Sequence, residues 1–151
     1  MNELFNQRKS VRSFKADPIE KKELKEILEA ANSAPSAGNL KARKIIIVAE
    51  KEKKEELAKA AYDQEFIAEA PVAIVFVALP KVSSHKYGEK GEKLYSIQDA
   101  TIAASFAWLQ TVDLGLAACW VGGFDEKNLQ QSLGLAENEK PVVILPIGHS
   151  T

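Results

Sequence analysis

Apolar and polar residues along the chain follow a helical period in some stretches and form short continuous runs in others. From Leu24 to Ala31, apolar residues recur at i, i+3, i+4 and i+7, which predicts an amphipathic helix that begins near Asp17-Pro18, with Asp17 as its cap. The stretches 44–49 and 72–79 are short, almost continuously apolar and rich in β-branched residues, so we expect buried strands there. Further strands are expected at 116–121 and 142–147.

Helices are expected at 2–9, 52–62, 94–114 and 125–133, with a helical turn or two within 63–70, and the order of elements indicates a sheet covered by helices. The helix 94–114 is apolar on all sides and rich in small residues, which indicates burial in the core or against another subunit. The most polar stretch, 80–93, is predicted to be a mobile loop or lid.

The composition is that of an ordinary soluble domain. With 151 residues, 46% hydrophobic and 27% charged, the chain is expected to form a single domain over residues 1–151 and is too apolar for intrinsic disorder. A net charge of −1 argues against a nucleic-acid or membrane-surface partner. No long apolar run and no signal-like N-terminus is present, so the cytoplasm is the expected location.

Side chains that could carry chemistry by themselves are few. One cysteine and two histidines that are far apart in sequence make a disulfide or a metal site unexpected. Cys119 lies in an apolar stretch, where an inert buried thiol is the more common case. The phosphate loop, the Gly-x-Gly-x-x-Gly motif and the Gly-x-Ser-x-Gly motif are all absent. No residue is therefore assigned as a catalytic acid, base or nucleophile, and an enzyme of this kind would depend on a cofactor.

Three segments could together hold such a cofactor. In Arg8-Lys9-Ser10-Val11-Arg12, alternation along an extended chain puts the two arginines and the serine on one side, as a phosphate cradle or as a solvated basic patch. In Ala34-Pro35-Ser36-Ala37-Gly38-Asn39, small residues would let a planar ligand approach the backbone, although the segment also fits an ordinary turn. At 115–124, a strand that ends in Gly122-Gly123 would expose backbone N–H groups, or would simply lead into the next helix.

Taken in order, these segments resemble those of the nitroreductase-like flavin oxidoreductases. Family members typically begin with Arg-Arg/Lys-Ser-x-Arg-x-Phe, here Arg8-Lys-Ser-Val-Arg-Ser-Phe14, and continue with a leucine-rich helix and Ala-Pro-Ser-x-x-Asn, here residues 34–39. An Ala-Pro-Val strand from Ala70, a Gly-Leu-x-x-x-Trp-x-Gly-Gly-Phe segment at 115–124 and a final Leu-Pro-Ile-Gly-His at 145–149 complete the resemblance. It covers nearly the whole chain.

The resemblance implies an α+β fold with a central, mainly antiparallel sheet flanked by helices, in an intertwined homodimer that binds two FMN molecules at the subunit interface. The helix 94–114 would then lie in the dimer core. The resemblance places Arg8, Ser10 and Arg12, with the backbone of Lys9, at the phosphate and ribityl chain of FMN. Pro35, Ser36 and Asn39 would contact the flavin from the partner subunit, and Gln64 would reach the polar edge of the ring. Val121, Gly122 and Gly123 would line the isoalloxazine, with an N–H near Gly122 facing N5.

The sequence departs from the family pattern at two places. Relatives usually read Asn-x-Gln-Pro-Trp where this chain has Asn39-Leu40-Lys41-Ala42-Arg43, so we expect Lys41 and Arg43 to favour anionic substrates, or Lys41 to contact the phosphate or the flavin. Many relatives also carry a basic phosphate-binding residue beyond the final Gly-His, whereas this chain stops at Thr151. Arg12, Lys41 or Arg43 is expected to take the place of that basic residue at the phosphate. The chain is interpreted as a minimal scaffold that needs a second copy to complete the site.

The function that the resemblance implies is FMN-dependent oxidation of NAD(P)H. In a ping-pong cycle, NADH or NADPH would reduce the flavin at N5, and a small acceptor such as a nitroaromatic, a quinone, free flavin or oxygen would reoxidise it. The alternative from another class is a non-catalytic dimer that carries flavin or another ligand without turnover. A specialised reduction such as dehalogenation is a further alternative, although the relatives that perform it carry long lid insertions, which this chain lacks.

Overall fold

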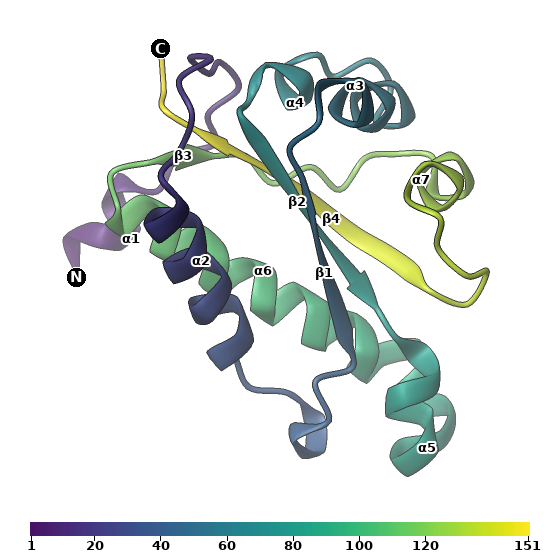
Figure 1. Cartoon of the computed structure of the whole chain (residues 1–151). Helices are drawn as coiled ribbons and strands as arrows, with labels where there is room; N and C mark the ends of the chain where they lie inside the picture. The colour runs from purple at the N-terminus through teal and green to yellow at the C-terminus, as the bar shows by residue number, and fades with distance from the viewer.

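The computed structural model describes residues 1–151 as one sheet of four strands between two groups of helices (Figure 1). The helices are α1 (Glu3–Gln7), α2 (Lys21–Ser33), α3 (Lys51–Ala60), α4 (Phe66–Glu69), α5 (Pro80–Lys90), α6 (Ser96–Asp113) and α7 (Glu126–Leu133). The strands are β1 (Arg43–Val48), β2 (Val72–Ala78), β3 (Ala117–Ala118) and β4 (Lys140–Gly148). A short helical turn, η1 (Ala37–Asn39), lies between α2 and β1, and a wide turn, η2 (Gly91–Tyr95), joins α5 to α6.

The strands lie in the order β1-β2-β4-β3, and each neighbouring pair is antiparallel. Val75, in the middle of β2, faces Ile46 of β1 on one side and Ile144 of β4 on the other. Every residue of β2 is buried, because the strand is internal and both faces of the sheet are covered. The predicted α+β fold with a mainly antiparallel central sheet is therefore confirmed, and so is the buried strand that begins at residue 72.

Alternate side chains of β2 point into two separate cores. Ile74 and Phe76 pack with α2 and α6, and Val75 and Val77 pack with α3, α4 and α7 on the opposite face of the sheet. The side of α6 that faces the sheet consists of small residues, namely Ala100, Ala103, Ala104 and Ala107. These alanines let α6 lie close to the strands, so this side of the helix is buried in the core, which is one of the two alternatives that the sequence left open.

Three helix ends show how far local signals determine the elements. α7 begins as predicted, with the Asp125 side chain accepting from the Asn128 N–H at 2.8 Å, and ends at Gly134, whose φ is +63°. The predicted cap of α2 is wrong, because the helix begins at Lys21 rather than near Asp17. The Glu23 carboxylate accepts from the Glu20 N–H at 2.8 Å, so the cap lies three residues later than the sequence indicated.

The prediction of a mobile loop or lid at 80–93 is also wrong, because α5 and η2 occupy this stretch and continue directly into α6. Pro80 lies in the first helical turn, where no backbone N–H is needed. The rings of Tyr87 and Tyr95 pack edge to face, with 5.2 Å between their centroids. Gly91 lies so close to Ser83 that an added Cβ would come within 2.6 Å of its carbonyl oxygen.

The strand expected at 116–121 is shorter than predicted. Only Ala117 and Ala118 pair with β4 as a strand, and Val121 returns to the sheet as a single bridge to Ile144. The outer edge of β3 is taken up by Ser10, which pairs with Ala118 in parallel orientation. None of the helices combines the length and the hydropathy that are needed to span a bilayer.

Candidate functional site

The basic segment from Arg8 to Arg12 lies along the edge of β3. The Val11 N–H donates to the Ala118 carbonyl at 3.0 Å, beside the bridge between Ser10 and Ala118. Ser10 and Arg12 are exposed, and so is Lys9, which leaves their polar groups available to a ligand. The segment is thus extended, as the phosphate-cradle hypothesis requires.

Arg8 is the half-buried member of this segment. Its guanidinium carbon lies 4.7 Å from the centre of the Trp108 ring on α6, which is a cation–π contact. The Trp108 ring in turn packs against Trp120, with 6.3 Å between centroids and 30° between the planes. The two tryptophans therefore hold the Arg8 side chain next to the segment that leads to Gly122.

The Gly122-Gly123 pair is open on its outer side. A Cβ placed on Gly122 would meet only the Trp120 side chain, at 3.6 Å, and one placed on Gly123 would meet nothing within 4 Å. Neither glycine N–H donates to a backbone carbonyl of the chain, whereas Val121 exchanges two hydrogen bonds with Ile144. The backbone thus offers free donors at the two glycines and a fixed anchor immediately before them.

Gln64 lies beside this pair. Its Nε2 donates to the Gly123 carbonyl at 3.3 Å and to the Ala61 carbonyl at 2.9 Å. Tyr62 and Asp63 have φ values of +58° and +60°, which turn the chain at the end of α3 and bring Gln64 to this position. The structure therefore brings three of the predicted groups together: the segment 8–12, Gln64 and the segment 121–123.

Cys119 is buried below Arg12 and does not add a nucleophile to this group. Its exposed fraction is 1%, and burial raises the pKa of its thiol, while the positive charge of Arg12 opposes that rise. The thiol is therefore protonated at neutral pH, as expected for an inert buried cysteine.

The remaining predicted residues, Pro35, Ser36, Asn39 and Lys41, lie in a separate loop between α2 and β1. The Ser36 Oγ accepts from the Lys41 N–H at 2.9 Å, which closes the loop. Gly38, Asn39 and Lys41 have φ values of +60°, +55° and +48°. Glycine adopts this conformation freely and asparagine tolerates it, whereas a lysine at positive φ is strained, and strain of this kind is found at functional loops.

A buried carboxylate binds the backbone of this loop at two places. Asp99, on α6, is 1% exposed; its Oδ1 accepts from the Ala37 N–H at 3.1 Å and its Oδ2 from the Ala42 N–H at 3.0 Å. Sequence reasoning missed Asp99, although it is the only charged residue between Ile97 and Val112 and so stands out in an apolar helix. An isolated acid in such a helix is the signal that could have identified it.

The expectation that Arg43 acts on substrates is wrong. Its side chain is 8% exposed and donates to backbone carbonyls at the end of α2 and in the loop, including those of Ala31 at 3.3 Å, Ala34 at 2.9 Å and Pro35 at 3.2 Å. Burial lowers the pKa of the guanidinium, and Asp99 opposes that shift. Arg43 therefore satisfies the free carbonyls of a helix end and is structural.

Within one chain, the loop 35–41 lies far from the other predicted site residues. Asp99 holds the loop near one end of α6, whereas Trp108 supports Arg8 nine residues further along the same helix. At 1.5 Å per residue this separation is about 13 Å along the helix axis. Figure 1 shows the same arrangement, with β3 and the start of β1 at opposite ends of α6.

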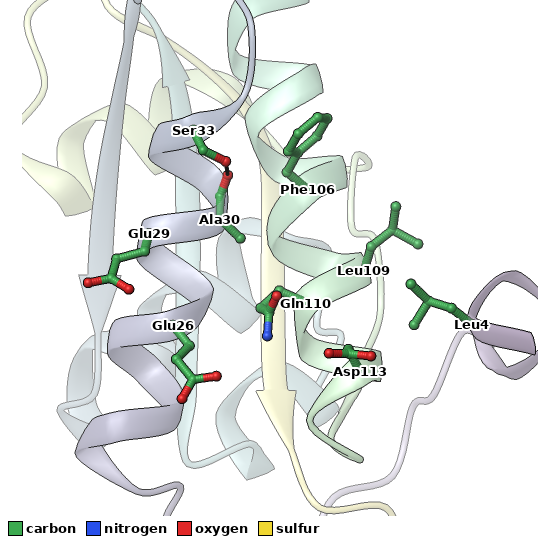
Figure 2. Close-up of a pocket in the computed structure, with 9 residues that line it drawn as sticks. All are labelled: Leu4, Glu26, Glu29, Ala30, Ser33, Phe106, Leu109, Gln110 and Asp113. Atoms are coloured by element: carbon green, nitrogen blue, oxygen red, sulfur yellow. Dashed lines mark hydrogen bonds between the residues drawn. The ribbon is translucent and has the colours of Figure 1, made fainter. Parts of the chain in front are cut away.

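A groove outside the candidate site lies between α2 and α6. It has a volume of about 680 Å³, and none of the predicted site residues line it. Figure 2 shows Phe106 and Leu109 of α6 on one side and Glu26 and Glu29 of α2 on the other.

Phe106 is 39% exposed and Ile97 37%, so the side of α6 that faces away from the sheet presents large apolar residues to solvent. No group of three or more potential metal ligands is present.

Comparison with known proteins defines the family. The profile described as the Nitroreductase family matches residues 6–64 and 59–149, and the chain therefore belongs to the nitroreductase family. An NADH dehydrogenase of Thermus thermophilus is 27% identical over 94% of this chain and 82% of its own length. An FMN reductase [NAD(P)H] of Bacillus subtilis is 32% identical over 99% of this chain and 66% of its own length.

Solved structures agree with this assignment. NfrA2 of B. megaterium superimposes with a TM-score of 0.89 at 28% identity, over 100% of this chain and 68% of that one. The NADPH:FMN oxidoreductase of Vibrio harveyi, solved in complex with NAD+, superimposes with a TM-score of 0.89 at 26% identity, over 98% of this chain and 67% of that one.

Proposed function

We propose that the protein is an FMN-dependent NAD(P)H oxidoreductase whose residues 1–151 form one FMN-binding domain. The observation that carries this proposal is the open Gly122-Gly123 pair, with free N–H groups, next to the basic segment Arg8–Arg12. Relatives named FMN reductase and NADPH-flavin oxidoreductase support the choice of cofactor.

The residues present fit FMN. A flat ring can lie against two glycines whose Cβ positions are empty, and a backbone N–H at Gly122 can donate to a ring acceptor. Arg8, Ser10 and Arg12, with the backbone of Lys9, would hold the phosphate and ribityl chain by charge-assisted hydrogen bonds. Gln64 and Val121 would border the ring, and both are already fixed by hydrogen bonds within the chain.

The chain's own contribution to the reaction is binding and orientation. FMN, when bound, supplies hydride and electron transfer at N5. The backbone N–H at Gly122 would donate to the ring and would favour negative charge there, because a fixed backbone group needs no reorganisation. No acid or base is assigned among the side chains of the site. We propose that the electron donor and the electron acceptor bind in turn at one surface, in a ping-pong order. The acceptor would be a small molecule such as a nitroaromatic, a quinone, a flavin or oxygen.

We further propose that the site is completed by a second copy of the chain. Asp99, which holds the loop of Pro35, Ser36, Asn39 and Lys41, lies nine residues, or about 13 Å along the helix axis, from Trp108, which supports Arg8. One chain therefore does not gather all of these residues at the ring. The apolar outer side of α6, with Ile97 and Phe106, is the surface that a partner would cover. A homodimer of this kind would place the loop 35–41 of one subunit at the Gly122-Gly123 pair of the other.

Anaerobic spectroscopy tests this function. The purified protein, loaded with FMN, is expected to show the visible absorption bands of oxidised flavin and to lose the longest-wavelength band on addition of NADH or NADPH. Reoxidation by a quinone or nitroaromatic should restore the band. A protein that binds FMN but is bleached by neither nicotinamide would instead be the non-catalytic flavin carrier, and one that fails to bind FMN would contradict the proposal.

A further inference from the structure

Two side chains of α5 lie directly on the loop 35–41. A Cβ placed on Gly38 would come within 2.5 Å of the Tyr87 hydroxyl and 3.1 Å of the Lys86 Nζ. Gly38 also has a φ of +60°, so both its conformation and its contact with α5 require glycine. The ammonium group of Lys86 is therefore held at the same loop that carries Ser36, Asn39 and Lys41.

The lysines around this contact lack acidic partners. Lys41, Lys86 and Lys90, which we call the lysine rim, have no carboxylate within 4.0 Å, whereas Lys93 pairs with Glu89. Asp99, the acid nearest to the loop along α6, uses both oxygens for backbone N–H groups. Glu89 and Glu92 lie on the same stretch of chain but form no ion pair with these three lysines, so the rim offers three unpaired ammonium groups on a chain whose net charge is −1.

Aromatic contacts limit the freedom of two of these lysines. Lys86 Nζ lies 5.4 Å from the centre of the Tyr87 ring, and Lys90 Nζ lies 5.6 Å from the centre of the Tyr95 ring. The two rings pack against each other. Two cations that are held on one aromatic pair lose less conformational freedom on binding an anion than free surface lysines do.

We propose that the lysine rim binds the phosphomonoester dianion of a substrate, and that Lys86 is the principal specificity-determining residue. This inference rests on the proposed function, because the rim borders the loop that a second chain would bring to the FMN site. A dianion matches several unpaired ammonium groups better than a single carboxylate does. Two substrates of the proposed reaction carry such a group, namely NADPH at its 2′-phosphate and free FMN, as acceptor, at its 5′-phosphate. NADH and riboflavin are the matched compounds that lack it.

Kinetic discrimination identifies which substrate uses the rim. For the wild-type holoprotein we expect a higher kcat/KM for NADPH than for NADH, or for FMN than for riboflavin. Lys86→Gln is expected to lower the value for the phosphorylated substrate about tenfold and to leave the other nearly unchanged, and Lys90→Gln is expected to act in the same direction. Lys51→Gln, which removes an exposed lysine on the opposite face of the sheet, is the charge-matched control. If Lys86→Gln changes neither ratio, or lowers both members of each pair equally, the inference is wrong.

A binding measurement separates this inference from the proposed function. Calorimetric titration of the holoprotein with adenosine 2′,5′-bisphosphate and with inorganic phosphate is expected to show saturable binding that Lys86→Gln weakens and Lys51→Gln retains. If NAD(P)H bleaches the holoprotein but the holoprotein binds neither probe, the inference about the lysine rim is wrong and the proposed function stands. A protein that is never bleached overturns the proposed function, while the titrations still decide whether the rim binds phosphate. Thermal melting of each variant confirms that the loss is not due to unfolding.

Discussion

The guanidinium of Arg8 lies over the ring of Trp108, 4.7 Å from its centre. This contact joins the N-terminal basic segment to α6, the helix that also carries Asp99 and its loop. Because Trp108 packs against Trp120, two residues before Gly122, the contact also links the proposed phosphate cradle to the proposed ring surface. Arg8 is therefore oriented before any ligand arrives.

Arg8→Ala is expected to weaken FMN binding by about 1.5–3 kcal/mol, which is roughly a 10- to 150-fold rise in Kd, because it removes a charge-assisted partner of the phosphate. Fluorescence titration of the apoprotein with FMN measures this change. Lys15→Ala, which removes an exposed cation just outside the basic segment Arg8–Arg12, is the control. Riboflavin should bind both variants alike, and an Arg8→Ala protein with unchanged FMN affinity would place the phosphate elsewhere.

Gly122→Val is expected to abolish FMN binding while the fold persists. The first added atom would lie 3.6 Å from Trp120, an ordinary contact, and the backbone of Gly122 is not in the left-handed region. We therefore expect Tm to change by no more than about 2 °C, as for a surface substitution. Normal flavin loading in this variant would show that the ring does not lie on the glycine pair.

Asp99→Asn is expected to destabilise the protein, because the two N–H groups bond different oxygens of Asp99 and the NH2 group that replaces one oxygen can donate but cannot accept. An unsatisfied buried N–H costs about 1–3 kcal/mol, which corresponds to a fall in Tm of about 2–12 °C for a chain of this size. The same change should weaken FMN binding by loosening the loop. The exposed Asp17 provides the control variant Asp17→Asn, and equal Tm values for the two variants would refute the role of Asp99.

Glu139 should contribute to stability in a pH-dependent way. The hydrogen bonds from Lys44 and from the Ala136 N–H lower the pKa of its carboxyl below the ordinary value of 4.5. Its contribution is therefore complete well above that value and is lost as the pH falls through the lowered pKa. In urea unfolding, Glu139→Gln should be less stable than the wild type at pH 7, and the difference should shrink as the pH falls through the lowered pKa of Glu139. A stability difference that persists at low pH would assign the effect to packing.

The sequence pattern predicted the elements whose signals are local. The fully buried β2 follows from a continuous apolar run, and α7 follows from the Asp125 cap and the Gly134 stop. The helix α5 was missed because it packs through Tyr87, Tyr95 and glycines rather than through an aliphatic stripe, so its residues appeared merely polar. The lid that was expected there depended on composition alone.

The site was predictable in its parts but not in its arrangement. Motif order identified the segments 8–12 and 121–123. The structure places Gln64 next to them through the turn at Tyr62 and Asp63, which the sequence pattern did not predict. The burial of Arg43 could not be predicted, because it depends on carbonyl groups at the end of α2 that converge only in three dimensions. The same holds for the contact of Lys86 with Gly38.

A site shared between two copies of the chain is the central claim, and FMN stoichiometry in mixed dimers tests it most directly. Gly122→Val removes the ring surface, and Asn39→Asp puts a charge at the loop while preserving a residue that tolerates its φ of +55°. Each variant alone is expected to bind little FMN. After co-refolding of equal amounts, the heterodimer should hold one FMN per dimer, because it contains one intact site. If the mixed dimers bind no more FMN than the parent variants, the site does not combine the two chains as proposed.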